Sequence, residues 1–128
     1  MMVAGVGCKA GASAGEIEAA IAEALARAGL STATLSALAT SSAKGDEPGI
    51  VAVATARGLK FVLVPQRDLE AAGARVVTRS ERVLAMMGVP SVAEAAALAA
   101  AGPASRLLGP RVAVGPATCA LAVSGDAT

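Results

Sequence analysis

A short apolar run, a glycine-rich break and a capped amphipathic helix follow one another at the start of the chain. Residues 2–6 are apolar enough for a buried strand. Ser13 and Glu16 have the spacing of a capping box, in which the serine caps a helix and the glutamate bonds back to it. Residues 17–28 then repeat apolar side chains at helical spacing. This order predicts a strand, a tight turn and a helix that packs against a sheet.

The same alternation continues along the chain. It predicts strands at 35–40 and 60–64 and helices at 47–57, 67–72 and 80–87, with a basic, irregular stretch at 73–82. A second capping-box spacing, Ser91 to Glu94, opens an alanine-rich helix that ends at Gly102. Strands at 112–114 and 118–123, joined by Gly115-Pro116, predict an antiparallel hairpin.

The predicted fold class is therefore α/β. We expect a single layered domain over 1–128, in which a mixed β-sheet is flanked by helices and followed by a C-terminal antiparallel hairpin. The expected ordered core is 2–123, and 124–128 is expected to be a tail.

Composition removes several classes of function. The chain has no histidine, which excludes Ser-His-Asp and Cys-His triads as well as histidine-ligated zinc or haem. Phe61 is the only aromatic residue, so there is no base-stacking platform for nucleic acid. A formal net charge of +1 argues against a general polyanion binder.

Two cysteines and the lack of long apolar runs bear on location. Cys8 and Cys119 lack metal-ligand spacing and are expected to be reduced thiols of a cytoplasmic protein. No uncharged run approaches the roughly 20 apolar residues of a membrane helix, and the start of the chain does not resemble a signal peptide. The sequence predicts a soluble protein without membrane or nucleic-acid partners.

The opening loop, VAGVGCKAGAS, matches neither nucleotide motif. Gly5, Gly7 and Gly11 are spaced one residue too far for a dinucleotide fingerprint, and Lys9 is not followed by serine or threonine as in a P-loop. The loop either contacts an anion through its N–H groups and Lys9, or is only a tight turn. Cys8 could be an activated thiolate, but a small buried apolar role is favoured because no base has a recognisable place beside it.

Other polar groups also have two interpretations. Lys44 and Glu47 lie between a strand and a helix, where α/β sheets place ligand sites, or they form a plain helical ion pair. Ser13 and Ser91 cap helices whose amino ends could still present N–H groups to a ligand carboxylate. Arginines 75, 79 and 82 form either a solvated face or a carboxylate-binding surface.

Several stretches in order resemble one family: VGCKAG, Lys44-x-x-Glu47-x-Gly49, Ser80, SVAEAAAL at 91–98 and the closing ATCALAV. Together they resemble the CobE family of cobalamin biosynthesis, equivalent to the carboxy-terminal domain of CbiG, over roughly residues 2–123. The resemblance implies a free-standing α/β domain in the aerobic route to cobalamin. In the larger CbiG proteins, which have further segments, the whole opens a lactone of a cobalt-precorrin.

Carried onto this chain, the resemblance implies ligand-binding positions that agree with the polar groups above. They are Gly5, Gly7, Cys8, Lys9, Lys44, Glu47, Ser80, Ser91, Glu94 and Thr118, and the amino end of the first helix adds Ser13. Precorrins carry carboxylates around a flat apolar macrocycle, so helix amino ends, basic side chains and small apolar residues suit them.

The leading functional hypothesis is a carrier or protector of a precorrin or corrinoid intermediate, without a cofactor or metal of its own. One alternative is a precorrin hydrolase, with Glu47 or Glu94 as general base and Lys44 or Lys9 steadying negative charge. A second is a docking module for another enzyme of the pathway.

Overall fold

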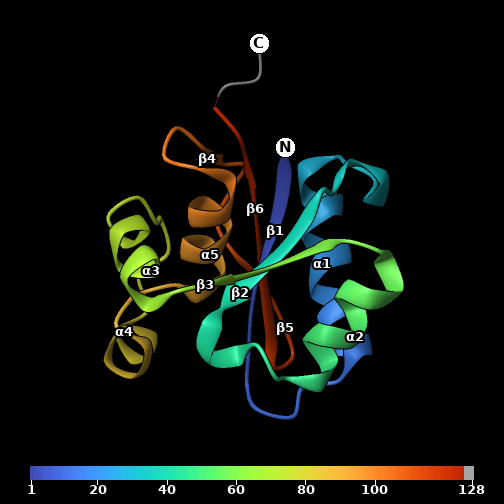
Figure 1. Ribbon diagram of the computed structural model, residues 1–128, viewed down its shortest axis with the longest axis horizontal. Helices are drawn as coiled ribbons and strands as arrows, with labels where there is room; N and C mark the ends of the chain where they lie inside the picture. Colours follow the sequence, from blue (N-terminus) through green and yellow to red (C-terminus); the bar gives the residue numbers. More distant parts are fainter. Residues whose placement is uncertain (126–128) are drawn as a thin grey trace.

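The computed structural model describes residues 1–125, which form one mixed sheet of six strands between two layers of helices (Figure 1). The strand order is β3-β2-β1-β6-β4, and β5 pairs with β6 beside this path. The strands are β1 (Met2–Cys8), β2 (Ala37–Ser41), β3 (Lys60–Val64), β4 (Arg106–Leu107), β5 (Val112–Val114) and β6 (Ala117–Val123). The fold class agrees with the α/β prediction.

The sheet is parallel on one side and antiparallel on the other. β1 pairs in parallel with β2, with Val3 opposite Ala37, and β2 continues in parallel to β3. The C-terminal strand β6 instead runs antiparallel to β1 over its whole length, from Met2–Val123 to Cys8–Ala117. It also takes β5 in the predicted hairpin, whose turn is Gly115-Pro116.

Five α-helices cover the two faces of the sheet in the described part of the chain (Figure 1). They are α1 (Ala14–Ala28), α2 (Pro48–Arg57), α3 (Gln66–Gly73), α4 (Glu81–Met87) and α5 (Val92–Ala101), with 3-10 turns at Thr32–Thr34 and Ser42–Lys44. α1 and α2 lie on one face, and α3, α4 and α5 on the other. The capping box of α1 is confirmed, since Ser13 accepts from the Glu16 N–H and Glu16 from the Ser13 N–H.

Strand alternation builds a separate core on each face. Ala4, Val6 and Leu38 face α1 and α2 and pack with Ile17 and Ile21. On the opposite face, alternate residues of the same strands pack with the alanines of α5 and with α3.

The alanine-rich helix α5 approaches β1 unusually closely. A Cβ at Gly5 would lie 2.1 Å from the carbonyl oxygen of Ala93 and 2.6 Å from the nitrogen of Ala97. Only glycine leaves room for this contact. Small residues on both elements therefore set the distance between helix and sheet.

The structure corrects three local predictions. Residues 106–107 pair with β6 as β4, which the sequence did not indicate. Glu94 does not complete the second capping box, because its carboxylate bonds elsewhere, as described below. The stretch 73–82 is not irregular throughout, because α3 extends to Gly73 and α4 begins at Glu81. Of the predicted tail, Ser124 donates hydrogen bonds to the carbonyl oxygens of Met1 and Ala101, and 126–128 lie outside the described residues.

Between residues 1 and 125 no single helix is both long and apolar enough to cross a membrane. α4 and α5 meet that description only as a pair bent by 64°, and most of α5 is buried in the core.

Candidate functional site

The carboxyl ends of β1 and β2 meet at one edge of the sheet, where each strand passes into a loop before a helix. β1 ends at Cys8 and is followed by residues 9–13, while β2 ends at Ser41 and is followed by residues 42–47. Open α/β sheets bind ligands at this edge, because helix amino ends and loop N–H groups converge there. We call this region the carboxyl edge.

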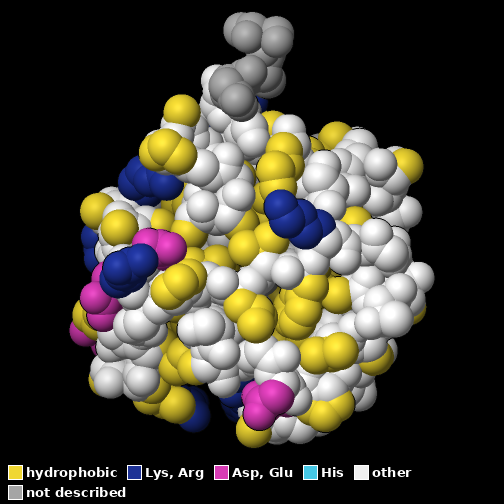
Figure 2. Space-filling view, in the orientation of Figure 1, with side chains coloured by type: hydrophobic (Ala, Val, Ile, Leu, Met, Phe, Trp, Pro, Cys, Tyr) yellow, Lys and Arg dark blue, Asp and Glu magenta, His cyan; other side chains and the backbone are white. Residues whose placement is uncertain are grey.

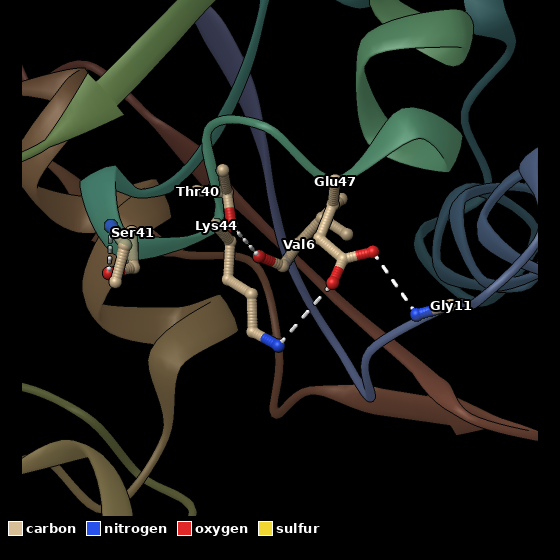
Figure 3. A network of polar contacts seen from close by, with 7 residues as sticks. Val6, Gly11, Thr40, Ser41, Lys44 and Glu47 are labelled. Carbon is tan, nitrogen blue, oxygen red and sulfur yellow. Dashed lines mark hydrogen bonds and ion pairs between the residues drawn. The ribbon is translucent and has the colours of Figure 1, made fainter.

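A carboxylate joins the two loops (Figure 3). Glu47 accepts a hydrogen bond from the N–H of Gly11 through Oε2, at 3.2 Å. Its Oε1 lies 3.9 Å from Nζ of Lys44. The side chains of Lys44 and Glu47 are only 23% and 13% exposed. Lys44 and Glu47 thus form an ion pair, although not within one helix, because Lys44 ends a 3-10 turn and Glu47 precedes α2. Through its bond to Gly11, Glu47 also ties the two loops together.

The strand ends beneath these loops are held by two threonine hydroxyl groups, of which that of Thr40 is buried and that of Thr118 is partly buried. Beyond the last ladder pair of β1 and β2, Thr40 donates through Oγ1 to the carbonyl of Val6 at 2.7 Å (Figure 3). On the other side of β1, Thr118 donates to the carbonyl of Gly7 at 3.2 Å. These bonds satisfy the hydrogen-bonding capacity of carbonyl groups near the end of β1. They also hold in place the strand ends from which the two loops leave.

Cys8 lies beside this cluster but is not activated by it. Burial raises the pKa of its thiol, Lys44 lowers it and Glu47 raises it again, with a net increase. A thiol with a raised pKa holds less of the nucleophilic thiolate at neutral pH. The geometry thus favours the apolar interpretation of Cys8.

The amino end of α5 reaches the same edge from the opposite face. A Cβ at Gly7 would lie 2.9 Å from Oγ1 of Thr118 and 3.7 Å from Cβ of Val92. Ser91 caps α5 by accepting from the N–H of Glu94 at 3.3 Å, and is itself buried. Gly7, Thr118 and the first turn of α5 are thereby brought together at the carboxyl edge.

Glu94 is fully buried and fully hydrogen-bonded. Its Oε1 accepts from the N–H groups of Val77 at 2.7 Å and Thr78 at 2.9 Å. Its Oε2 accepts from the hydroxyl of Thr78 and from the N–H of Arg111 at 2.8 Å. Burial alone would raise the pKa of Glu94, but these donors outweigh burial and hold it below the ordinary value. Such a carboxylate has no lone pair left for a substrate proton, and we expect its role to be structural.

The remaining predicted site residues are spread around the carboxyl edge. Lys9 is exposed, and its backbone N–H donates to the carbonyl of Pro116 in the hairpin turn. Ser13 is occupied in its capping box. Ser80 caps α4, and its N–H donates to the carbonyl of Pro90 just before α5.

An open hollow of about 330 Å³ adjoins the loop that carries Gly11. It lies between the first loop and the start of α2 and is lined by Gly11, Ala12, Ser13, Ala14, Pro48, Gly49 and Ala52. Its walls are apolar side chains and backbone, next to the Lys44–Glu47 pair. Such a surface can contact an apolar group, and the neighbouring lysine can contact an acidic one.

The site offers charge and hydrogen bonding rather than metal ligands. Within residues 1–125, no group of three or more acidic, histidine or cysteine side chains is close enough together to hold a metal ion. Glu47 is the one predicted base that faces the loops of the carboxyl edge, and it is already engaged with Gly11 and Lys44.

Sequence reasoning missed Thr40 and the role of Gly11. Gly11 was noted only as a glycine of the opening loop, although it supplies the N–H that Glu47 needs. Thr40 could have been recognised because it is a polar residue near the end of an apolar strand. The partners of Glu94, at Thr78 and Arg111, gave no local signal because they are distant in sequence.

Nearly all of the chain matches known proteins of one family. Residues 2–122 match the family model described as "Cobalamin synthesis G C-terminus". A protein of Sinorhizobium sp called CobE is 36% identical over 127 residues, which cover 99% of this chain and 81% of the relative. A crystal structure of CobE, described as a protein from the cobalamin (vitamin B12) biosynthetic pathway, superposes with a TM-score of 0.90 at 36% identity. That match covers 95% of this chain and 89% of the other.

A longer relative matches over a part of its length. The cobalt-precorrin-5A hydrolase of Priestia megaterium is 33% identical over 102 residues. These residues are 80% of this chain but only 27% of the hydrolase.

Proposed function

This chain belongs to the family of the cobalamin synthesis G carboxy-terminus, and on that premise we propose that it binds a precorrin or corrinoid intermediate at the carboxyl edge. It is a protein of cobalamin biosynthesis. In the proposed role it holds and hands on the intermediate rather than transforming it. The family membership and the resemblance of its motifs were both expected from the sequence.

The position of the lysines is the observation that carries this proposal. The chain has three lysines, Lys9, Lys44 and Lys60. Two of them follow the carboxyl ends of β1 and β2, beside loop N–H groups and the apolar hollow. An intermediate with carboxylates around an apolar ring would lay the ring on the small residues and its carboxylates against the lysines.

The state of the two candidate bases favours a carrier over a hydrolase. Glu94 is saturated by four donors, and Glu47 already accepts from Gly11 and pairs with Lys44. The hollow is open to solvent, whereas hydrolytic sites gain much of their electrostatic strength by excluding water. One observation supports the hydrolase hypothesis, namely the partial match to the Priestia megaterium enzyme.

A visible-absorbance titration tests the binding. We expect a saturable spectral shift with cobyrinic acid, a corrin with carboxylate side chains, and a weaker one with cobinamide, whose side chains are amidated. Lys9→Ala and Lys44→Ala should each lower the affinity for cobyrinic acid by about tenfold. Lys60→Ala is the matched control, because Lys60 begins β3 at the opposite end of the sheet. Equal affinities for both corrins, or no shift with either, would contradict the proposal.

Glu47→Gln separates the carrier from the hydrolase. In a carrier the variant should keep most of its affinity, because the amide can still accept the Gly11 N–H. In a hydrolase turnover should fall by about a hundredfold or more with loss of the base. Mass spectrometry of a precorrin-type lactone incubated with the protein would show whether any ring-opened product forms. If no corrin binds while another enzyme of the pathway co-purifies regardless of Lys9 and Lys44, the docking-module reading applies.

A further inference from the structure

Glu47 stands at the cap position of α2 without capping that helix. It is the N-cap residue, yet its side chain accepts no hydrogen bond from the first turn. The residues that cap helices well are serine, threonine, aspartate and asparagine, whose short side chains reach the N–H groups of that turn. The carboxylate of Glu47 points instead to the loop that follows β1 (Figure 3). It therefore serves a contact between two loops rather than its own helix.

The bond from the N–H of Gly11 to Glu47 is a single tie. Within residues 1–125 it is the one hydrogen bond between residues 9–13 and residues 42–47. The neighbouring N–H groups of the first loop are used elsewhere, since Lys9 donates to the carbonyl of Pro116 and Ala12 to the carbonyl of Lys9. Loss of the Glu47 carboxylate would thus leave the two loops without a polar link.

The start of α2 lies close enough to the first loop for Glu47 to span the gap. A Cβ at Gly49 would lie 2.3 Å from the carbonyl oxygen of Ala12, so only glycine permits this approach. Gly11 and Pro48, the neighbour of Glu47 in the chain, both line the hollow. The hydrogen bond between the loops therefore lies at the margin of the hollow.

The same carboxylate holds the ammonium group of Lys44 nearby without a hydrogen bond to it. Their separation of 3.9 Å is too long for a hydrogen bond but short enough for an ion pair. In the described part of the chain, Glu47 is the one acidic group paired with Lys44, whose side chain is 23% exposed. Figure 2 shows only a small group of charged side chains at its lower margin, in the region of the loop after β2. The N–H groups of the ammonium thus remain free of Glu47 and available to a ligand carboxylate.

We propose that Glu47 is a positioning residue of the ligand site, which fixes the first loop through Gly11 and the ammonium of Lys44 at one separation. This rests on the proposed function and assigns Glu47 a role that is neither base nor ligand contact. A ligand then meets the apolar hollow and the lysine in a prepared arrangement, and binding need not order the loops first. The spacing Lys44-x-x-Glu47-x-Gly49 follows from this arrangement, because each of the three positions has its own part in it.

The sign of the effect of Glu47→Ala separates positioning from charge. Removal of a negative charge beside Lys44 would by itself strengthen the binding of an anion. Loss of the tie should instead weaken it, and we expect the affinity for cobyrinic acid to fall by about tenfold. The affinity for cobinamide, which offers no carboxylate to Lys44, should change by less than about threefold. Visible-absorbance titrations measure both affinities.

Glu47→Asp separates positioning from stability. The variant keeps the charge, but its side chain is one methylene group shorter and should not reach Gly11. Aspartate is a strong N-cap residue, so the urea midpoint of this variant should lie above that of Glu47→Ala. Its affinity for cobyrinic acid should nevertheless be as low. A merely structural role would make affinity follow stability in the two variants.

Two further variants complete the comparison. Glu47→Gln should bind cobyrinic acid within about threefold of the wild type, because the amide oxygen still accepts the Gly11 N–H. The amide proton resonance of Gly11 reports this bond without a ligand, and it should move upfield in Glu47→Ala and Glu47→Asp but much less in Glu47→Gln. Asp46→Asn is the matched control, since Asp46 is an exposed acidic residue of the same loop. It should leave both affinities within about twofold.

Each outcome decides the proposal. If the wild type binds cobyrinic acid and the alanine and aspartate variants bind it within about twofold, positioning by Glu47 is wrong while the proposed function stands. Tighter binding by Glu47→Ala would show that the carboxylate competes with the ligand, and an equal loss in Glu47→Gln would show that only its charge matters. Both results overturn the positioning role. If the wild type binds neither corrin, the proposed function and the positioning role fall together.

Discussion

Individual buried residues decide how closely the layers of this protein approach. Gly5 lets the backbone of α5 touch β1, and Glu94 gathers N–H groups from two loops onto the start of the same helix. Cys119, in contrast, is a core residue whose burial raises the pKa of its thiol to about 12. At this scale the properties of a side chain follow from its neighbours rather than from its type.

Gly5→Ala should destabilise the protein by about 3 kcal/mol, because the added methyl group collides with backbone atoms of α5 that cannot move independently. Urea unfolding monitored by circular dichroism measures the loss. Gly15→Ala in the first turn of α1 is the control, since a Cβ there meets nothing closer than 3.9 Å. That substitution should be neutral or stabilise by about 0.5 kcal/mol. Equal effects at both positions would contradict the close approach.

Glu94→Gln should lower the free energy of unfolding by about 2–3 kcal/mol at neutral pH, because an amide nitrogen would face N–H donors. The folded-state pKa of Glu94 is depressed, so its contribution is complete above the ordinary glutamate pKa of 4.5 and is lost as the pH falls through the lower folded value. The stability difference between wild type and variant should therefore narrow below about pH 4.5. A difference that stays constant down to pH 2 would show that the charge of Glu94 is not involved.

At the scale of elements, helices are fastened to one another by a few defined contacts. α1 and α2 are joined by Arg57, whose Nε lies 2.9 Å from Oε1 of Glu18 and 3.1 Å from Oε2. Because the two helices follow β1 and β2, this link joins the early part of α1 to the last residue of α2. α4 has fewer ties, and its anchors are Gln66 and Ser80.

A double-mutant cycle with Arg57→Met and Glu18→Gln should give a coupling energy of about 1 kcal/mol at low salt. The pair Arg27–Glu23 within α1 is the comparison. It is more exposed and joins residues of the same helix, so its coupling should be only about 0.3 kcal/mol. Both values should fall in high salt, the second nearly to zero. A larger coupling for Arg27–Glu23 would refute the bridging role of Arg57.

At the scale of the whole molecule, the two ends of the sequence form the centre of the sheet. β1 and β6 pair over seven residues each, and both helix layers pack on them. The antiparallel half of the sheet therefore forms only when the last strand has paired with β1. Non-local pairing of this kind closes the whole chain into one cooperative unit.

Native-state hydrogen exchange should reveal this arrangement. We expect the slowest amides in β1 and β6, exchanging only by global unfolding, and faster exchange in α4 and in the outer edge of β3. Two-dimensional NMR of the protein transferred into deuterated buffer would resolve the difference. Uniform protection across α4 and β1 would contradict the prediction, and so would β6 exchanging before β1.

The sequence by itself determined the elements and the fold class. Capping residues, helical periodicity and apolar runs act between near neighbours, so α1, α5, β3 and the β5–β6 hairpin were predicted close to their observed bounds. β4 could not be predicted, because two residues carry no periodic signal. The candidate residues Lys44 and Glu47 were also visible, since a polar loop between a strand and a helix is a local pattern.

Only the tertiary structure decided which of these residues meet. The parallel pairing of β1 with β2 brings Gly11 to Glu47, which is 36 positions away in the chain. The same folding turned Glu94 from an expected cap into a junction of two loops, and it set the end of α4 beside the start of α3. Such contacts depend on how the layers pack, and no window of neighbouring residues contains that information.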